Sequence, residues 1–448
     1  MRRWRRLSRV ASTIVVLTTA VVLSVATLGG VSSAGEEKPP ADDIGITDDE
    51  IRLAVIADVE NSLVPGLFQA SVDGMEAWAR WVNKQGGIAG REVVIDFIDS
   101  HLSPDDARNA VIQACAEDFA LVGGQALFLN NVDDMVACPD KNGQPTGIPD
   151  IPGLALEPAQ KCSGITFVAT GDQEFCDTRD QRPQTYYPFQ GDFRWYLKEN
   201  KDLHGIFAVP NDLKSTRDSI IPMVEAAMEL GIRPDGEGMY NTSARQPQSA
   251  ITPLIQVVKE NGSNFVYNGN APTVMVYLRK EAKLQGVDSV DVWACHQGCY
   301  TQEFLDQGGP DVEGTYSITY TLPFYSEPRK NPTLRALLKE LGADVEDMNA
   351  NGIAAWVAGL LFQRAANEVV DSGETLTRAT LLDALRNIHD FDANGIMGPT
   401  DVGNHKASEC FVISQVQNGK WKRVYPKKPG TFDCSKQNKT SIQLDLLE

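Results

Sequence analysis

The sequence predicts an α/β protein made of two doubly wound parallel-sheet lobes. Two observations lead to this fold class. Short apolar strand patterns alternate with amphipathic helix patterns along most of the 448 residues, which is typical of parallel sheets covered by helices on both faces. The alternation pauses after residue 169 and starts again at residue 191, so we expect two lobes.

The first run of elements begins with the apolar strand Ile51–Ile56. In the next segment, Val72–Lys84, Met75 and Trp78 recur at helical spacing, and two glycines end the pattern. After Ser103, a proline and two acids indicate the first turn of another helix. The remaining expected elements are the strands Val93–Phe97, Ala120–Val122, Ile148–Leu156 and Ile165–Ala169 and the helix Asn131–Cys138.

The second run repeats the alternation and ends in a hairpin. Its expected helices are Gly191–Glu199, Ser215–Leu230, Ala250–Asn261, Val274–Leu284 and Thr301–Gln307, and its expected strands are Gly205–Val209, Gly238–Tyr240, Phe265–Tyr267, Val290–Ala294 and Thr315–Tyr320. Three further helices follow at Pro332–Leu341, Gly352–Asp371 and Thr377–Ile388. The strands Cys410–Gln417 and Lys420–Tyr425 then meet at Asn418-Gly419, a strong hairpin turn signal.

The N-terminus has the pattern of an export signal. Five arginines lie in the first nine residues, residues 10–35 carry no charge, and Ser32, Ser33 and Ala34 supply small residues for cleavage. We therefore expect a signal peptide over residues 1–34 and a polar tether over residues 35–49. The alternative is an uncleaved segment that tethers the protein to the membrane, because the apolar run is just long enough to cross a bilayer. In either case we expect the protein to be exported, to the periplasm or to the cell surface.

Charge and motifs exclude several function classes. The chain has 60 acidic and 41 basic residues, a net charge of −19, and such a surface repels phosphate backbones. We expect no nucleic-acid partner. The sequence has no G-x-S-x-G, H-E-x-x-H, Walker A or G-x-G-x-x-G motif. We therefore predict that the protein is not an enzyme and needs no cofactor. A secreted hydrolase is disfavoured because it would need a nucleophile elbow after a strand, and the sequence has none.

The eight cysteines all follow the signal, and an even count in an exported chain indicates disulfides. Their local spacing favours the sequential pairs Cys115–Cys138, Cys162–Cys176, Cys295–Cys299 and Cys410–Cys434. Two metal sites are alternatives. Cys295, His296 and Cys299 offer three zinc ligands but have no second pair nearby. Asp390–Gly395 copies the start of a calcium loop, but its twelfth position is Asp401 instead of Glu and Pro399 blocks the helix that should follow. An Asx-rich turn is the alternative. We expect no metal.

Several strings, in order, resemble one known family. Ile51–Ile56, Gly74–Ala79 and Val82–Glu92 match its first β-α-β unit, in which a helix ending in Asn-x-x-Gly-Gly-Ile-x-Gly precedes a strand. Asn264–Gly269, the helix Val274–Gly286, Val312–Tyr316 and Met397–Thr400 match later parts. From about residue 50 to 425 the chain resembles the type I periplasmic solute-binding proteins, the branched-chain amino acid (Leu/Ile/Val) receptor group of ABC transporters.

The resemblance implies two lobes joined by a three-strand hinge. We place the crossings near Phe167–Gly171, Ile318–Phe324 and Ile396–Val402, so that lobe one holds residues 50–168 and 325–395 and lobe two holds 169–324 and 396–448. The resemblance also implies that a monomer captures a small organic molecule between its lobes, closes over it, and delivers it to an ABC permease in the membrane. A ligand-sensing module for a membrane partner, without transport, is the alternative.

The resemblance also indicates where a ligand binds. Amino-acid-binding relatives hold the ligand carboxylate with hydroxyls of lobe one and the ammonium with an acid of lobe two. Here Leu127 or Phe128, and Leu156, stand at the hydroxyl positions, and Gln297 stands at the acid position. We therefore expect a ligand less zwitterionic than leucine, neutral or monoanionic, with a hydrophobic body. Further cleft candidates are Asn61, Ser62, Phe68, Gln125, Ala155, Asn211, Asp212, Lys214, Asn268, Asn270 and Tyr300.

Overall fold

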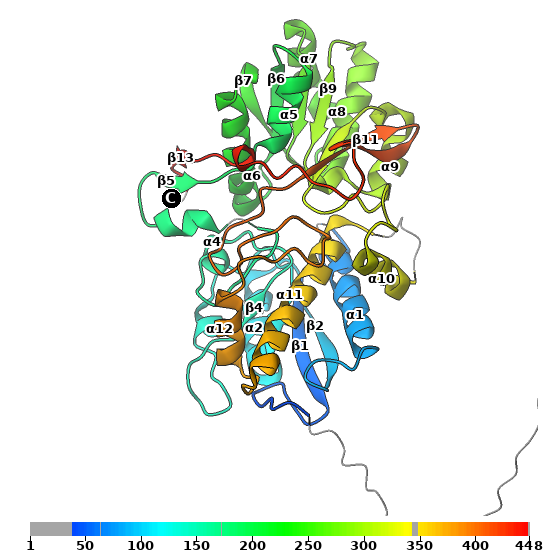
Figure 1. The fold of residues 1–448 in the computed structure, drawn as a ribbon. Coiled ribbons are helices and arrows are strands. Elements are labelled where there is room, and N and C mark those ends of the chain that lie inside the picture. Colours follow the sequence, from blue (N-terminus) through cyan, green and yellow to red (C-terminus); the bar gives the residue numbers. More distant parts are fainter. Residues whose placement is uncertain (1–37, 63, 172, 343–347, 447–448) are drawn as a thin grey trace, which may run out of the picture. The chain divides into compact units, whose positions relative to one another are not determined.

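Two large β-sheets flanked by helices form most of the described chain, and this confirms the predicted fold class (Figure 1). The structure, a computed structural model, describes residues 38–446 apart from residues 63, 172 and 343–347. The expected signal peptide lies outside the described residues. Within them, no helix combines the length and the apolar character that crossing a membrane requires.

The first sheet has the strand order β2-β1-β3-β4, and all its neighbours are parallel. Its inner strand β1 is buried along almost its whole length, as expected for a strand covered on both faces. We call this sheet, with the helices packed on it, the first lobe. Its elements are β1 (Glu50–Ala57), α1 (Gln69–Asn83), β2 (Glu92–Asp99), α2 (Pro104–Glu117), β3 (Ala120–Val122), α3 (Asp133–Val136), β4 (Asp150–Ile151) and α4 (Pro158–Lys161).

Three later helices return to the first lobe. They are α10 (Pro332–Leu341), α11 (Ala350–Ser372) and α12 (Arg378–Arg386). In Figure 1 the yellow and orange α11 and α12 lie among the blue and cyan elements, and α1 packs against both α10 and α11. Glycines permit this approach: a Cβ on Gly74 would lie 2.4 Å from the carbonyl oxygen of Gly352, and one on Gly359 would lie 2.5 Å from the ring of Trp78.

The second sheet has the order β12-β11-β10-β9-β8-β6-β7. The five adjacent strands β10, β9, β8, β6 and β7 run parallel. The hairpin β11–β12 adds to β10 in antiparallel pairing. We call this sheet and its helices the second lobe. Its elements are α5 (Gly191–Glu199), β6 (His204–Pro210), α6 (Lys214–Glu229), β7 (Arg233–Thr242), α7 (Thr252–Asn261), β8 (Phe265–Asn268), α8 (Pro272–Gln285), β9 (Val292–Cys295), α9 (Gln302–Gly308), β10 (Tyr316–Thr319), β11 (Val412–Gln417) and β12 (Lys420–Tyr425).

Local signals predicted the hairpin and the disulfides correctly. The turn residues Asn418 and Gly419 both have positive φ, 54° and 69°, as a two-residue hairpin of this kind requires. All four predicted disulfides form, Cys115–Cys138, Cys162–Cys176, Cys295–Cys299 and Cys410–Cys434. The zinc alternative is therefore wrong, because both of its sulfurs are bonded to each other.

Some expected elements are shorter or longer than predicted. The strand expected over Ile148–Leu156 is reduced to β4, because Pro149 and Pro152 flank it and cannot donate to a ladder. By contrast, β7 extends over ten residues although only three were expected. Gly236 and Gly238, both with positive φ, interrupt its strand pattern in the sequence. The pairing register between β6 and β7 shifts beside these glycines. A small separate sheet pairs β5 (Gln184–Tyr186) with β13 (Ile442–Leu444).

The described part of the expected tether, residues 38–49, is packed on the first lobe. The backbone of Asp42 donates to Leu376, and the guanidinium of Arg91 donates to the carbonyl of Thr47 at 2.8 Å. The carboxylate of Asp43, which is buried, accepts from the backbone of Arg378. The polar composition of residues 38–49 did not reveal these long-range partners.

Candidate functional site

One cavity of about 500 Å³ combines apolar walls with charged side chains. Its volume lies within the range of small-molecule sites, roughly 300–1,000 Å³. Several lining segments follow the ends of strands: Leu156 and Glu157 come after β4, His296 and Gln297 directly after β9, and Tyr320 directly after β10. Open α/β sheets bind ligands beyond the carboxyl ends of their strands. The cavity therefore has the position expected of a ligand site.

One face of α6 forms a second part of the wall. Its lining residues recur three and four positions apart, which places them on one side of the helix. The helix begins at Lys214, and its N-cap residue Leu213 has no side chain that could accept from the first backbone N–H groups. The lining residues of α6 are Lys214, Ser215, Asp218, Ser219, Ile220, Pro222 and Met223.

Aromatic rings form the apolar wall. Phe175 and Tyr186 stack with their centroids 5.6 Å apart and their planes nearly parallel. Phe189 and Tyr320 meet edge to face at 5.2 Å. All four rings line the cavity. Such a wall binds a hydrophobic ligand body through area burial and ring contacts.

Three lysines line the cavity, and each contacts another protein group. The ammonium of Lys214 donates to the carboxylate of Asp218 at 2.7 Å. Lys439 pairs with Glu174, and the ammonium of Lys161 lies 5.2 Å from the centre of the Phe175 ring. The positive charges of the wall are therefore already engaged.

The acidic side chains of the wall differ in their surroundings. Burial raises the pKa of Glu157, a hydrogen bond with the Ser215 side chain lowers it in part, and the neighbouring Asp218 raises it further. The pKa of Tyr186 rises to about 12, because the phenol is buried and Asp218 lies near it. Glu157, Asp218 and Tyr186 thus supply the wall with two carboxyl groups and a neutral phenol, and Asp218 is paired with Lys214.

The turn after β9 is rigidly held. The Cys295–Cys299 disulfide closes it. Within it, the Nε2–H of His296 donates to the carbonyl of Asn270 at 2.8 Å, and Nδ1 accepts from the backbone of Gly298 at 3.1 Å. Burial lowers the pKa of His296, although the hydrogen bond to Asn270 raises it in part. The fixed ring holds the neighbouring Gln297 at the cavity wall.

A family model described as periplasmic binding protein matches residues 50–420. The chain belongs to this family. The resemblance found in the sequence is thereby confirmed. No curated protein matches the chain significantly.

Solved structures share the fold of this periplasmic binding protein. A leucine binding protein from Thermotoga maritima has a TM-score of 0.62 at 16% identity, over 84% of this chain and 97% of that one. A fatty acid ABC transporter substrate-binding protein from Thermomonospora curvata has a TM-score of 0.64 at 15% identity, over 88% and 98%. An ABC transporter substrate-binding protein from Aeropyrum pernix reaches 0.64 at 16% identity, over 87% and 97%. At these identities the likeness shows the fold.

Three of the ligand-binding candidates named from the sequence line the cavity of this periplasmic binding protein. They are Leu156, Lys214 and Gln297. Each follows a strand end closely enough for its position to be estimated from the chain alone. The structure brings Leu156 of the first lobe together with the other two, which come from the second.

The other candidates of the first lobe lie outside the cavity lining. Phe68, Gln125, Leu127 and Ala155 are buried, and the amide of Gln125 donates to the carbonyl of Asn351 at 3.0 Å. Ser62 is exposed, and Asn61 and Phe128 are partly buried. The Asn61 amide donates to the carbonyl of Val64 at 3.0 Å. These side chains mostly serve the packing and the loops of the lobe.

The remaining candidates of the second lobe also lie outside the lining. Asn268 and Asn270 are buried, and their amides donate to carbonyls of Asn270 and Thr242, both at 3.0 Å. Asn211 is exposed, as is Asp212, whose carboxylate accepts from the backbone of Ala244 at 2.8 Å. Tyr300 is fully buried and packs on Phe324, Tyr325 and Trp421.

Sequence reasoning missed most of the aromatic wall. The rings of Phe175, Tyr186, Tyr187 and Phe189 come from a segment without strand or helix periodicity. The spacing of residues on α6 could have predicted this part of the wall, because one helix face carries Ser215, Asp218, Ser219, Pro222 and Met223. Glu157, directly after Leu156, was also overlooked.

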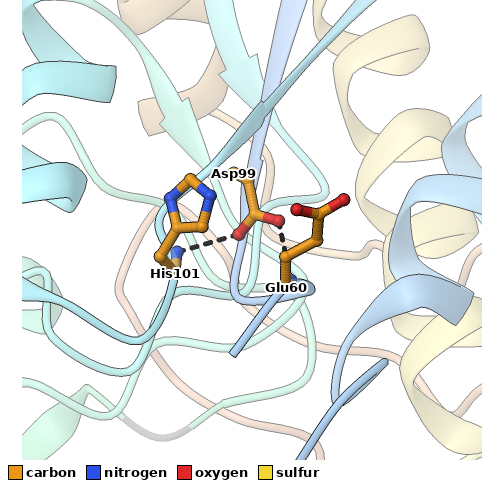
Figure 2. A group of neighbouring side chains, drawn as sticks. All are labelled: Glu60, Asp99 and His101. Atoms are coloured by element: carbon orange, nitrogen blue, oxygen red, sulfur yellow. Dashed lines mark hydrogen bonds between the residues drawn. The ribbon is translucent and has the colours of Figure 1, made fainter. Parts of the chain in front are cut away.

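A second group of polar side chains lies where β1 and β2 end. Carboxylate oxygens of Glu60 and Asp99 and a ring nitrogen of His101, atoms of the kind that coordinate metal ions, lie within 4.8 Å of one another. Figure 2 shows Asp99 between the other two, accepting from the backbone N–H groups of Glu60 at 2.7 Å and His101 at 2.8 Å. Burial raises the pKa of Asp99, but these backbone hydrogen bonds outweigh it and lower the pKa overall. Asp99 therefore organises the two loops.

Proposed function

We propose that this periplasmic binding protein captures a small organic molecule in the described cavity and delivers it to an ABC importer in the membrane. One observation carries the proposal: the cavity wall is built from segments that follow strand ends of both sheets, where open α/β sheets bind ligands. Proteins of the same fold are described as a leucine binding protein and as a fatty acid ABC transporter substrate-binding protein. Both descriptions support solute capture.

We also propose the lobe boundaries and the hinge expected from the sequence. Lobe one comprises residues 50–168 and 325–395, and lobe two comprises 169–324 and 396–448. Two of the three expected crossings lie side by side, since the backbone of Leu322 donates to the carbonyl of Ile396 at 2.7 Å. At the remaining crossing, Phe167–Gly171, the backbone N–H of Phe167 donates to the carbonyl of Asp150 in the first sheet at 2.8 Å. Connecting segments paired through their backbones in this way support hinge closure.

The protein acts by binding, without chemistry, as an exported monomer with no nucleic-acid partner. The net charge of −19 supports the last point. Its ligand is less zwitterionic than leucine. In support, Leu156 and Gln297, which replace the expected hydroxyl and acid, both border the cavity. A full zwitterion would leave a buried charge unpaired at a cost of several kcal/mol.

The test is to identify the molecule that the protein carries through purification. Native mass spectrometry of exported protein, followed by denaturing extraction, should show one bound organic molecule. Small-angle scattering should then show compaction when that molecule is added back to stripped protein. An unchanged profile at saturation would contradict hinge closure, and measured turnover would contradict binding without chemistry. Unchanged uptake of the molecule by cells lacking the protein would favour a sensing role.

A further inference from the structure

We infer that the cavity selects ligands whose polar end is an organic cation, such as an ammonium group, and that Glu157 determines this specificity. The inference rests on the proposed function, because it assigns a ligand class to the same cavity. It departs from the expectation from sequence, which was a neutral or monoanionic molecule. Four features of the wall support it: the place of Glu157, two orphan polar atoms, the engaged lysines and the aromatic rings.

Glu157 occupies the place where a ligand carboxylate would otherwise bind. The first turn of α6 borders the cavity, and its N-cap Leu213 leaves the backbone N–H groups without a side-chain acceptor. Such a helix start attracts anions. The carboxylate of Glu157 already faces this turn through the Ser215 side chain. A ligand carboxylate would therefore meet a like charge.

Two buried polar atoms beside Glu157 lack a hydrogen-bond partner among the described residues. They are the hydroxyl of Tyr186 and Oδ1 of Asp218, whose nearest charged partner is the guanidinium of Arg217 at 3.7 Å, beyond hydrogen-bond distance, and both residues line the cavity. Buried polar groups usually have partners, so an orphan pair at a cavity wall indicates a ligand group. An ammonium has three N–H donors and no acceptor. Its donors match the carboxylates of Glu157 and Asp218 and the Tyr186 oxygen, which all belong to residues of the cavity wall.

The lysines of the wall do not offset this preference. Lys214 is paired with Asp218 at 2.7 Å, Lys439 with Glu174, and Lys161 lies over the Phe175 ring. A ligand carboxylate would have to displace one of these contacts. The ring faces of Phe175 and Tyr186, stacked 5.6 Å apart, receive a hydrophobic body and also attract a cation near their faces.

The test compares three probes with one hydrophobic body and different head groups: 4-phenylbutylamine, 4-phenylbutanol and 4-phenylbutanoate. Titration calorimetry on ligand-stripped full-length protein should show that the amine binds about tenfold more tightly than the alcohol, and the carboxylate most weakly. In Glu157→Gln the amine should lose about tenfold in affinity while the alcohol changes little. Glu157→Asp, which keeps the charge, should recover part of that loss.

Glu374→Gln, which neutralises an exposed glutamate away from the cavity, is the matched control and should bind all three probes like the unmodified protein. Equal thermal unfolding temperatures establish that the variants fold. If the carboxylate binds as tightly as the amine, or Glu157→Gln leaves amine affinity unchanged, the inference fails while ligand capture stands. If no probe binds, the molecule carried through purification decides: a cation supports the inference and an anion or a neutral molecule overturns it. Finding no such molecule counts against both proposals.

Discussion

Replacing Asp118 by asparagine should stabilise the protein at and above neutral pH. Asp118 follows α2 and is fully buried, and its carboxyl interacts with Asp96, which Arg52 holds in an ion pair at 2.6 Å. Burial raises the pKa of Asp118 from 3.8 to about 8, and the contact with Asp96 adds to the rise. The folded protein therefore keeps this carboxyl protonated at pH values where the unfolded chain has lost the proton.

The sign and size of the effect follow from this difference. Below pH 3.8 both states hold the proton and the carboxyl costs nothing. Between pH 3.8 and about 8 the unfolded chain ionises first, so the free energy of unfolding falls as pH rises. Each pH unit costs about 1.4 kcal/mol, and the whole interval sets a ceiling of roughly 5–6 kcal/mol. Because Arg52 attracts the charged form, we expect a gain of about 2–3 kcal/mol at pH 8.

The assay is urea unfolding followed by tryptophan fluorescence, at pH 4.5 and at pH 8. Asp118→Asn keeps the shape of the side chain and can donate to Asp96, so its gain should be under about 1 kcal/mol at pH 4.5 and reach its full size at pH 8. Asp371→Asn, at an exposed aspartate of α11, is the control and should change neither value. A loss of stability at pH 8, or the same gain at both pH values, would refute the reasoning.

Three further predictions concern packing, a buried cation and ligand binding. Gly359→Ala should cost about 2 kcal/mol because its methyl group would lie 2.5 Å from the buried ring of Trp78, whereas Gly164→Ala, which meets no atom within 4 Å, should be neutral in thermal unfolding. Arg378→Met should cost about 2–4 kcal/mol in urea unfolding, because its buried guanidinium donates to several main-chain carbonyls, Cys115 among them at 3.0 Å; a cost below 1 kcal/mol would contradict this. Affinity for 4-phenylbutylamine should fall as pH drops toward the raised pKa of Glu157, and calorimetry across pH 5–8 should find no such fall in Glu157→Gln.

The sequence by itself determined the features that depend on neighbouring residues. Apolar alternation and helical spacing predicted the two-lobe α/β fold, because a strand or helix buries its own repeating face. Asn418-Gly419 predicted the hairpin turn through the positive φ that both residues tolerate. Export and spacing together predicted all four disulfides. The strings between residues 50 and 425 were enough to indicate the family.

The candidate site was only partly accessible in this way. Leu156, Lys214 and Gln297 border the cavity because each stands just beyond a strand end, a position that the chain order fixes. Asn268 and Asn270 also follow a strand end, yet their amides satisfy buried carbonyls. Whether a polar side chain after a strand serves a ligand or its own loop depends on which backbone groups would otherwise lack partners.

Only the tertiary structure decided the composition of the wall. Phe175, Tyr186 and Phe189 lie in a segment whose sequence has no period, so nothing local shows that the rings gather on one cavity. The same holds for Arg378, whose carbonyl partners come from more than 200 residues away in the chain, and for residues 38–49, which pack against the first lobe. Secondary structure follows from interactions within a few residues, whereas burial of a ring or a charge depends on partners that only the folded chain brings near.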